Sequence, residues 1–313
     1  MCLSFDKFHT PVLLQEAVDC LLAAGDGIFV DGTLGGGGHA EAILQRLSPL
    51  SSLICFDADA DAVRYASQRL EVFGDRISIL HANFRTIKRI LNGKKIENIA
   101  GLILDLGVSS YQLDEPSKGF SFQADERLDM RMNRNEPLDA FAIVNEYGEK
   151  ELADVIWKYG EERQSRKIAR AIVWSREQAP IGTTANLARI VSGAAGGKFR
   201  TKTLARVFQA IRIEVNRELE NLRIVLEDGI KLLRPGGRLV VISYHSLEDR
   251  IVKQTFKTAA EGKKDFPFPL SPMPLHEEPN VTLVMRKPVI ASEEEIRRNS
   301  RARSAKMRAI EKR

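Results

Sequence analysis

The sequence contains few of the residues that build disulfide frameworks or metal sites. Its 313 residues include three cysteines, Cys2, Cys20 and Cys55, whose spacing matches neither a zinc motif nor a disulfide pattern. The five histidines are scattered and form no cluster with acids or cysteines, so we expect no bound metal. Because unpaired cysteines are typical of reducing compartments, we expect a cytoplasmic protein.

The chain also lacks long apolar runs, repeats and low-complexity segments. No stretch approaches the roughly 18 apolar residues that a membrane span needs, and residues 1–6 have neither the basic start nor the apolar core of a signal peptide. The net charge of +5 is mild, so the distribution of charge matters more than its sum. The composition predicts a globular protein with no membrane association, of one large domain or two ordinary ones.

The most informative segment is a glycine-rich turn, residues 31–39, which reads Asp-Gly-Thr-Leu-Gly-Gly-Gly-Gly-His. It lies between an apolar run at 28–30 and a helical pattern at 40–47, as at the start of a nucleotide-binding unit. Glycine has no Cβ, which lets a ligand lie against the backbone. The spacing departs from G-x-G-x-x-G and Asp31 precedes it, which favours the cationic S-adenosylmethionine (SAM) over a dinucleotide. A glycine-rich loop without a ligand is the alternative.

Apolar runs alternate with helical patterns in the first third of the chain and return near its end. A helix is predicted over residues 12–22. Predicted strands cover residues 28–30, 53–56, 77–80, 100–104 and 238–243, with a final extended pair at 266–270 and 281–286. Strands that alternate with helices form a mostly parallel sheet with helices on both faces. The sequence therefore predicts an α/β fold.

The segment between the fourth and fifth predicted strands is far too long for one crossover helix. Helical patterns cover residues 150–159 and 164–178, and Thr183 or Thr184 is a suitable cap for a further helix. These patterns predict a helical subdomain inserted into the α/β domain.

A last helical pattern runs from Lys202 to Leu233. Single helices of that length are unusual, so we expect a break between Asn216 and Leu222. The predicted boundaries assign residues 1–118 and 218–313 to the α/β domain and residues 119–217 to the inserted subdomain.

Chemically useful side chains follow the predicted strands. Asp57, Phe84, Asp105 and Ser243 fall at or just after carboxyl ends, where ligands bind in open parallel sheets. Asp57 comes roughly 20 residues after the glycine turn, where an acidic residue typically hydrogen-bonds ribose hydroxyls. The sequence leaves open whether Asp105 merely caps a turn, and whether Phe84 contacts an adenine or only the core.

Several short strings resemble the bacterial RsmH (MraW) proteins in sequence, order and rough spacing. They are Gly-Gly-Gly-His (36–39), His-Ala-Asn-Phe (81–84), Leu-Asp-Leu-Gly-Val-Ser-Ser-x-Gln-Leu-Asp (104–114), Gly-Phe-Ser-Phe (119–122), Leu-Asp-Met-Arg-Met (128–132), Tyr-Gly-Glu-Glu-Arg (159–163), Phe-Gln-Ala-Ile-Arg-Ile-Glu-Val-Asn (208–216), Tyr-His-Ser-Leu-Glu-Asp-Arg (244–250) and Asn-Ser-Arg-Ala-Arg-Ser-Ala-Lys (299–306). The resemblance implies a Rossmann-like, SAM-dependent methyltransferase. Its substrate would be the exocyclic N4 amine of a cytidine in 16S ribosomal RNA of the small subunit.

The resemblance also implies site residues. Those for SAM are Gly37, Gly38, His39, Asp57, Phe84, Asp105 and Gln112. Asp105 and His245 are the candidate catalytic residues. Tyr111 departs from the family, whose members often have proline there, and a tyrosine could stack on a base. The (Asp/Asn/Ser)-Pro-Pro-aromatic motif of many amino methyltransferases is absent, so the acceptor amine must be held differently.

Clustered positive charge favours an RNA substrate. Residues 161–217 carry twelve Lys or Arg against four acids, and residues 297–313 carry eight against one. The candidate RNA-binding residues are Arg212 and Asn216, which share a helix face with Gln209, together with Arg301 and Arg303. The alternatives are a solvated helix face and a tail that packs on the sheet, with Ala302, Ala305, Met307 and Ala309 partly buried.

Three other functions remain possible from the sequence. A nicotinamide-dependent oxidoreductase is disfavoured by the glycine spacing and by Asp31. A non-catalytic RNA-binding protein is disfavoured by the presence of Asp57 and Asp105. Charge alone does not separate RNA from DNA as the substrate.

Overall fold

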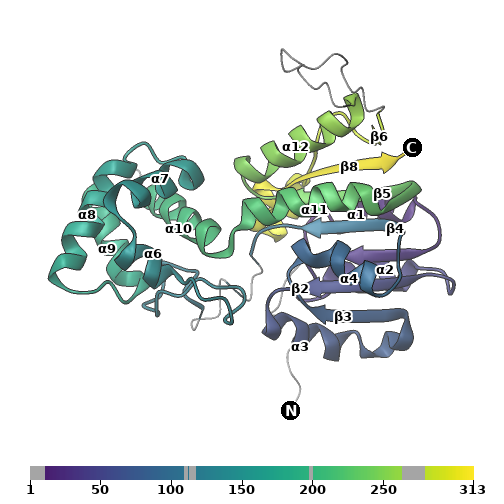
Figure 1. The fold of residues 1–313 in the computed structure, drawn as a ribbon, viewed down its shortest axis with the longest axis horizontal. Coiled ribbons are helices and arrows are strands. Elements are labelled where there is room, and N and C mark those ends of the chain that lie inside the picture. Colours follow the sequence, from purple (N-terminus) through teal and green to yellow (C-terminus); the bar gives the residue numbers. More distant parts are fainter. Residues whose placement is uncertain (1–10, 109–111, 113–117, 197–199, 263–278) are drawn as a thin grey trace, which may run out of the picture. The chain divides into compact units, whose positions relative to one another are not determined.

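The computed structural model describes residues 11–108, 112, 118–196, 200–262 and 279–313. The chain forms two compact units (Figure 1). We call Phe8–Gly107 with Leu219–Arg313 the sheet unit, and Val108–Glu218 the helical unit.

The sheet unit is built on one mixed sheet. Its strands are β1 (Ile28–Asp31), β2 (Ser52–Asp57), β3 (Ile77–His81), β4 (Ile99–Asp105), β5 (Leu233–Ser243), β6 (Val281–Leu283), β7 (Val289–Ile290) and β8 (Lys306–Lys312). The order is β3-β2-β1-β4-β5-β8-β6, with β7 also paired to β8. Strands β1 to β5 are mutually parallel, whereas β8 is antiparallel to its neighbours. The predicted α/β fold with a mostly parallel sheet is confirmed.

Helices cover both faces of this sheet. On one face lie α1 (Leu14–Leu22), α2 (Gly38–Arg46) and α3 (Ala60–Arg69), and on the other α4 (Ile87–Gly93), α11 (Glu218–Leu232) and α12 (Ser246–Glu261). Shorter elements are η2 (Glu71–Arg76), η3 (Phe84–Thr86), α13 (Glu293–Arg298) and η5 (Ser300–Ser304). Phe29 packs in one core cluster and its neighbour Val30 in the other. This alternation buries both faces of the strand.

The basic C-terminal segment is part of the sheet. Strand β8 pairs with β5 and β6, and Ala302, Ala305, Met307 and Ala309 are all buried. The packed-tail alternative is therefore confirmed for these residues. Of the predicted extended pair, 281–286 contains β6, whereas 266–270 lies outside the described residues.

The helical unit has its own hydrophobic core. Its helices are α6 (Ala140–Glu146), α7 (Glu149–Gly160), α8 (Ser165–Gln178), α9 (Thr184–Ala195) and α10 (Arg200–Asn216). Thr183 caps α9, since its side chain accepts from the Asn186 N–H. The predicted break is also confirmed, because α10 ends at Asn216, α11 begins at Glu218, and Arg217 between them has a φ of 49°.

Candidate active site

The glycine turn joins the end of β1, at Asp31, to α2, which begins at Gly38. Gly35 has a φ of 51°, and Gly37, the N-cap of α2, has a φ of 79°, a region that L side chains rarely adopt. A Cβ on Gly38 would lie 2.9 Å from Pro11 Cγ, so this glycine is needed for packing. At Gly35 an added Cβ would meet a single atom within 4 Å, a backbone oxygen at 3.9 Å. The turn is therefore closely packed at Gly38 and open at Gly35.

Asp57, the last residue of β2, holds this turn in place. Its Oδ2 accepts a hydrogen bond from the Gly35 N–H at 2.7 Å, and its Oδ1 accepts from the Asp59 N–H at 2.8 Å. Asp59 in turn caps α3. A carboxylate accepts about four hydrogen bonds, so these contacts are compatible with an additional bond from a ligand hydroxyl.

Asp105, the last residue of β4, lies among polar groups from three other segments. Its N–H donates to Thr33 Oγ1 at 2.6 Å, which ties β4 to the glycine turn. Its Oδ1 accepts from the Tyr244 hydroxyl at 2.7 Å, and its Oδ2 lies 3.5 Å from His39 Nδ1. The structure thus brings Asp105 together with the predicted His39 and with two partners, Thr33 and Tyr244, that were not predicted as its contacts.

His39 is neutral and presents a lone pair to Asp105. Its Nε2 lies 3.2 Å from the Val12 carbonyl oxygen, which can only accept, so Nε2 carries the proton. Burial lowers the pKa of His39 to about 4. The Nδ1 atom is therefore an acceptor, and the 3.5 Å approach to Asp105 is not an ion pair. Two acceptors at this distance fit a shared donor that lies beside both of them, such as an ammonium group.

Tyr244 follows the end of β5 and orients the Asp105 carboxylate. Burial, and then the negative charge of Asp105, hold the pKa of the phenol above its usual value, so the hydroxyl stays protonated and donates. The ring lies against Gly107, where an added Cβ would come 3.3 Å from Tyr244 Cδ2. Gly107 has a φ of 95°, which also favours glycine.

Asp31 is a buried carboxyl group whose two oxygens differ in their hydrogen bonding. Its Oδ1 accepts from the Thr33 N–H at 2.9 Å, whereas Oδ2 has no hydrogen-bond partner among the residues that the structure describes. Burial, with the nearby charges of Asp105 and Asp57, raises its pKa to about 7. Three carboxyl groups therefore surround the glycine turn, and a cation is the ligand they favour.

The raised pKa of Asp31 predicts a specific pH dependence of folding. Between about pH 4 and pH 7 the folded protein holds a proton on Asp31 that the unfolded chain has lost, so the free energy of unfolding falls as the pH rises through that window. We expect Asp31→Asn to remove a slope of up to roughly 1.4 kcal/mol per pH unit. Urea unfolding of both proteins across this range tests it, and parallel stability curves would contradict it.

Phe84, the first residue of η3, lies beside the glycine turn. It is half-buried, and a Cβ added to Gly32 would lie 3.4 Å from Phe84 Cβ and 2.5 Å from Leu104 Cδ2. The ring also packs against the core cluster that contains Leu104. Phe84 therefore contributes to the core, and its contact with an adenine stays a prediction.

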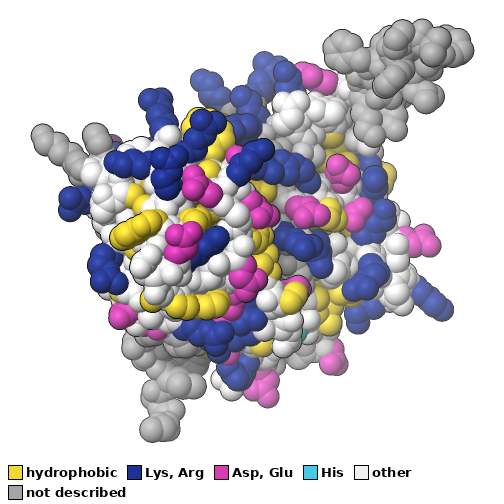
Figure 2. All heavy atoms as spheres, turned by 60° about the vertical axis from the view of Figure 1, so that its left-hand side comes forward, with side chains coloured by type: hydrophobic (Ala, Val, Ile, Leu, Met, Phe, Trp, Pro, Cys, Tyr) yellow, Lys and Arg dark blue, Asp and Glu magenta, His cyan; other side chains and the backbone are white. Residues whose placement is uncertain are grey.

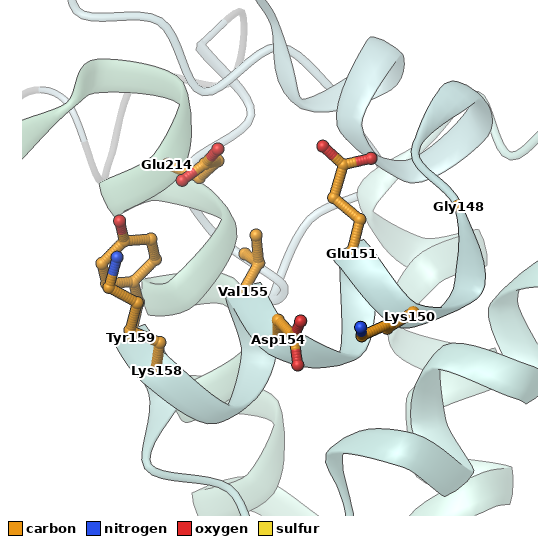
Figure 3. A pocket seen from close by; sticks show the side chains of 8 residues that line it. All are labelled: Gly148, Lys150, Glu151, Asp154, Val155, Lys158, Tyr159 and Glu214. Carbon is orange, nitrogen blue, oxygen red and sulfur yellow. The ribbon is translucent and has the colours of Figure 1, made fainter.

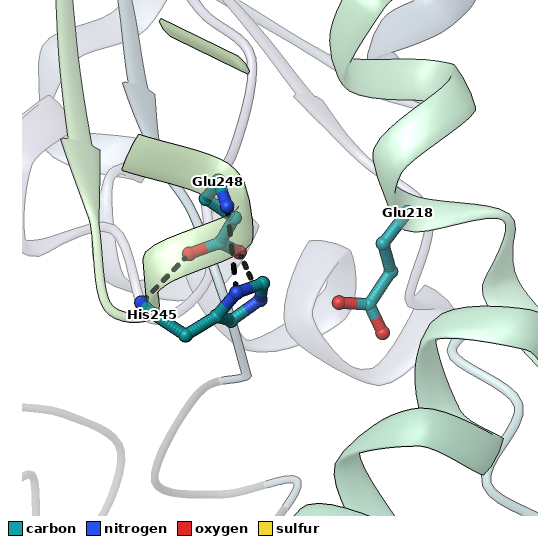
Figure 4. Close-up of side chains that lie close together, drawn as sticks. All are labelled: Glu218, His245 and Glu248. Carbon is teal, nitrogen blue, oxygen red and sulfur yellow. Dashed lines mark hydrogen bonds and ion pairs between the residues drawn. The ribbon is translucent and has the colours of Figure 1, made fainter. Parts of the chain in front are cut away.

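His245, the second candidate catalytic residue, caps α12 (Figure 4). Its Nδ1 accepts from the Glu248 N–H at 3.4 Å, while Glu248 Oε2 accepts from the N–H groups of Tyr244 and His245. Its Nε2 lies 3.2 Å from Glu248 Oε1, but outside hydrogen-bond geometry. The imidazole has a structural role in starting the helix, which favours Asp105 as the residue that acts on a ligand.

The remaining SAM candidate, Gln112, belongs to the helical unit and is buried. Its role toward SAM stays a prediction. Tyr111, beside it in the sequence, lies outside the described residues.

The polar face of α10 is engaged in internal contacts. Arg212 forms a bidentate pair with Glu218, at 2.8 and 2.9 Å. Asn216 donates to the Met130 carbonyl at 2.8 Å and accepts from the Met132 N–H at 2.8 Å. These two side chains brace the 130–132 loop and the end of α10, and their contact with RNA stays a prediction.

Four cations of the C-terminal segment, including the predicted Arg301 and Arg303, differ in their surroundings. Lys306 and Arg308, on β8, both contact the Asp249 carboxylate, at 3.2 and 2.7 Å. Arg301 and Arg303 lie on η5, where Arg303 is exposed. The first two are sheet components, which leaves Arg301 and Arg303 as the RNA candidates.

A hollow of about 540 Å³ on the helical unit contains none of the predicted site residues (Figure 3). It is lined by Gly148, Lys150, Glu151, Asp154, Val155, Lys158, Tyr159 and Glu214. Carboxylates and ammonium groups alternate around it, so its charge favours neither anions nor cations.

Among the described residues, no helix is both long and apolar enough to cross a membrane.

Comparison with known proteins tests the resemblance that the motifs suggested. The model of the MraW methylase family matches residues 6–313. A ribosomal RNA small subunit methyltransferase H from Carboxydothermus hydrogenoformans is 46% identical over 309 residues, 97% of each chain. One from Chlorobaculum parvum is 48% identical over 321 residues, 98% of each chain. A solved rRNA methylase from Streptococcus thermophilus aligns with 96% of this chain and with 95% of its own chain. The identity is 12% and the TM-score is 0.43, so the family assignment does not depend on this likeness. The chain belongs to the MraW methylase family.

Proposed function

We propose that the protein is a SAM-dependent methyltransferase that modifies small-subunit ribosomal RNA at the N4 amine of a cytidine. The observation that carries this proposal is the Asp105 carboxylate. It lies at the end of β4, bonded by Tyr244 and facing the lone pair of His39. Membership of the family supports methyl transfer as the reaction, and the names of the relatives support small-subunit ribosomal RNA as the substrate. The choice of a cytidine amine as the acceptor rests on the resemblance of the motifs.

The described residues fit SAM. Burial, and then the charges of Asp105 and Asp57, raise the pKa of Asp31, and a cation bound among these three carboxyl groups relieves their mutual repulsion. An ammonium group satisfies the facing acceptors of His39 and Asp105. We assign the ribose hydroxyls to Asp57, because it ends β2 and bonds to Gly35, whose backbone is open.

The rate of this reaction depends mainly on how the protein positions the acceptor nitrogen relative to the methyl group. When bound, SAM supplies a methyl group that its sulfonium has already activated. The residues of the site bring the acceptor nitrogen into line with that group and exclude water. The lone pair of a cytosine amine is delocalised into the ring, so hydrogen bonds from its N–H groups must localise it. Asp105 and the backbone carbonyls from Leu106 onward are the acceptors assigned to this task.

RNA recognition is assigned mainly to the helical unit. A base inside structured RNA has to be turned out of its stack before an enzyme can reach its amine. The helical unit has its own core and carries the cationic segment 161–217. We therefore expect it to bind the RNA, and we expect the protein to act in the cytoplasm on small subunits or their late precursors.

Mapping of modified cytidines tests the proposed function. Small subunits from cells that lack the protein should gain N4-methylcytidine when incubated with the protein and SAM. Matched DNA should not be methylated, and NADH should not bind. Methylation of another atom, or of DNA alone, would overturn the assignment. Binding of the subunits without methyl transfer would instead support a non-catalytic RNA-binding protein.

Asp57 provides a prediction about cofactor affinity. Asp57→Ala should weaken SAM binding by about 1–3 kcal/mol, because hydrogen bonds to a charged acceptor are lost and the Gly35 turn loses its anchor. Asp57→Asn keeps one acceptor oxygen and should lose less. Calorimetry on folded variants measures both, and unchanged affinity in Asp57→Ala would remove this residue from the site.

The C-terminal cations provide a prediction with an internal control. Arg301→Gln with Arg303→Gln should weaken RNA binding and flatten its salt dependence, by up to roughly one unit of slope per lost phosphate contact. Lys306→Gln with Arg308→Gln should lower the Tm and leave the slope unchanged, because these side chains hold Asp249. RNA affinity at several salt concentrations and thermal melts distinguish the pairs. An unaltered slope in the first pair excludes its phosphate contacts.

A further inference from the structure

Both tryptophans of the chain lie exposed on the helical unit. Trp157, near the end of α7, is 57% exposed, and Trp174, on α8, is 66% exposed. Tryptophan is highly buried on average, yet the core of the helical unit contains neither side chain. Exposed large aromatic side chains are frequent anchors in complexes.

The exposed side of α8 is cationic as well as aromatic. Lys167, Arg170 and Trp174 follow one another at three- and four-residue spacing, so they share one side of the helix. All three are exposed, whereas Ile168 and Ile172 are buried in the core of the unit. The helix therefore presents a stripe of two cations followed by a tryptophan.

Positive charge dominates this part of the sequence. Between residues 163 and 176 there are five Lys or Arg and no acid. Arg163, Arg166, Lys167 and Arg170 are exposed. Arg170 lies 3.5 Å from Glu149, but both side chains are largely exposed, and such a pair contributes little. The exposed side of α8 therefore keeps a net positive charge, whereas α7 carries the exposed acids Glu149, Glu151 and Asp154 against Lys150 and Lys158.

Trp157 extends the same face from the neighbouring helix. Residues 161–164 join α7 to α8, and the Arg170–Glu149 pair connects the middle of α8 with the start of α7. The two helices are therefore antiparallel, which places the end of α7, with Trp157, toward the start of α8. Figure 2 shows hydrophobic side chains exposed among both basic and acidic side chains on this unit.

We infer that this α7–α8 face binds an unpaired segment of the substrate RNA. Bases stack on Trp157 and Trp174, and phosphates contact Arg163, Arg166 and Lys167. Aromatic side chains stack on bases of any sequence, and cations beside them follow the backbone. The inference rests on the proposed function, because it names the surface by which the methyltransferase holds its RNA.

The charge of the face favours RNA over a protein partner. The centres of protein–protein interfaces are depleted in lysine and other charged residues. Here four exposed cations lie beside the tryptophans on α8 and in the turn before it. A polyanion with exposed bases matches both features, whereas a protein surface would match only the aromatic one.

Tryptophan fluorescence tests the inference on the full chain, because these two side chains are its only tryptophans. Titration with purified, unmodified small ribosomal subunits should quench the emission in wild type, in Trp157→Phe and in Trp174→Phe. The probe reports binding whether or not a methyl group is transferred. Unchanged emission at subunit concentrations that saturate methylation would overturn the inference while leaving the proposed function intact.

Affinity measurements provide the second test. Trp157→Ala with Trp174→Ala should weaken RNA binding roughly 10-fold or more, while the Phe variants retain most of it and SAM affinity is unchanged. Arg163→Gln, Arg166→Gln and Lys167→Gln together should reduce the salt slope by about two units. Lys253→Gln with Lys257→Gln, exposed on α12 of the sheet unit, is the matched control. Wild-type RNA affinity in the double Ala variant, or loss of a protein partner instead, would overturn the inference.

Discussion

Asp105→Asn is expected to lower kcat/KM for methylation by roughly 10²–10⁴-fold, the equivalent of about 2–5 kcal/mol for removing a charge from a buried, hydrogen-bonded pair. The substitution keeps the shape of the side chain, so the Tyr244 bond and the Thr33 contact can persist. The loss should appear in SAM affinity, in kcat or in both. Calorimetry and single-turnover kinetics separate these contributions.

Tyr244→Phe serves as the matched control for that result. It leaves the Asp105 charge in place and removes only the 2.7 Å hydrogen bond that orients it. We expect roughly a 10- to 100-fold loss of kcat/KM, because a hydrogen bond to a charged group contributes about 1.5–3 kcal/mol. If Asp105→Asn retained normal rates and SAM affinity, Asp105 would be a turn-capping residue and the proposed site would be wrong.

Replacing residues 109–217 with a flexible Gly/Ser linker is expected to abolish methylation, by more than about 10³-fold, and to leave SAM binding within roughly 10-fold of wild type. The sheet unit contains the glycine turn, Asp57 and Asp105, and it has its own core clusters. The RNA-binding surfaces assigned to the helical unit would be lost with it. Calorimetry with SAM and methyl transfer to small subunits are the two measurements.

Circular dichroism and a thermal melt provide the control for this deletion. A folded sheet unit that methylates its substrate at the normal rate would contradict the assignment of RNA binding to the helical unit. A folded sheet unit that has lost all SAM affinity would show instead that Gln112, in the removed segment, is essential for the cofactor.

Local sequence patterns were sufficient for most of the fold. Buried parallel strands such as residues 100–104 appear as continuous apolar runs, and Thr183 signals the start of α9. Strand β8 was harder to predict, because its charges at Lys306 and Arg308 suggest a solvated tail. The Asp249 carboxylate, more than fifty residues earlier in the chain, pairs with both of these cations. No local sequence pattern reveals that pairing.

The candidate site was predictable where it depends on strand ends. Asp57 and Asp105 follow directly from the rule that ligands bind at carboxyl ends. The contacts of Asp105 with Thr33 and Tyr244 join residues 72 and 139 positions apart, so sequence spacing does not indicate them. The internal contacts of the polar face of α10 were not predictable for the same reason, since the loop that Asn216 braces lies 84 and 86 positions away.

The insertion of the helical unit between β4 and β5 has a consequence for folding kinetics. These strands are hydrogen-bonded neighbours, yet more than a hundred residues separate them in the chain. During synthesis the edge of β4 stays unpaired until the whole helical unit has left the ribosome, and unpaired strand edges are prone to aggregation. The helical unit is continuous in sequence and can fold first. Once folded, it shortens the flexible chain between β4 and β5, so the entropy cost of closing β5 onto β4 no longer grows with the full length of the insertion.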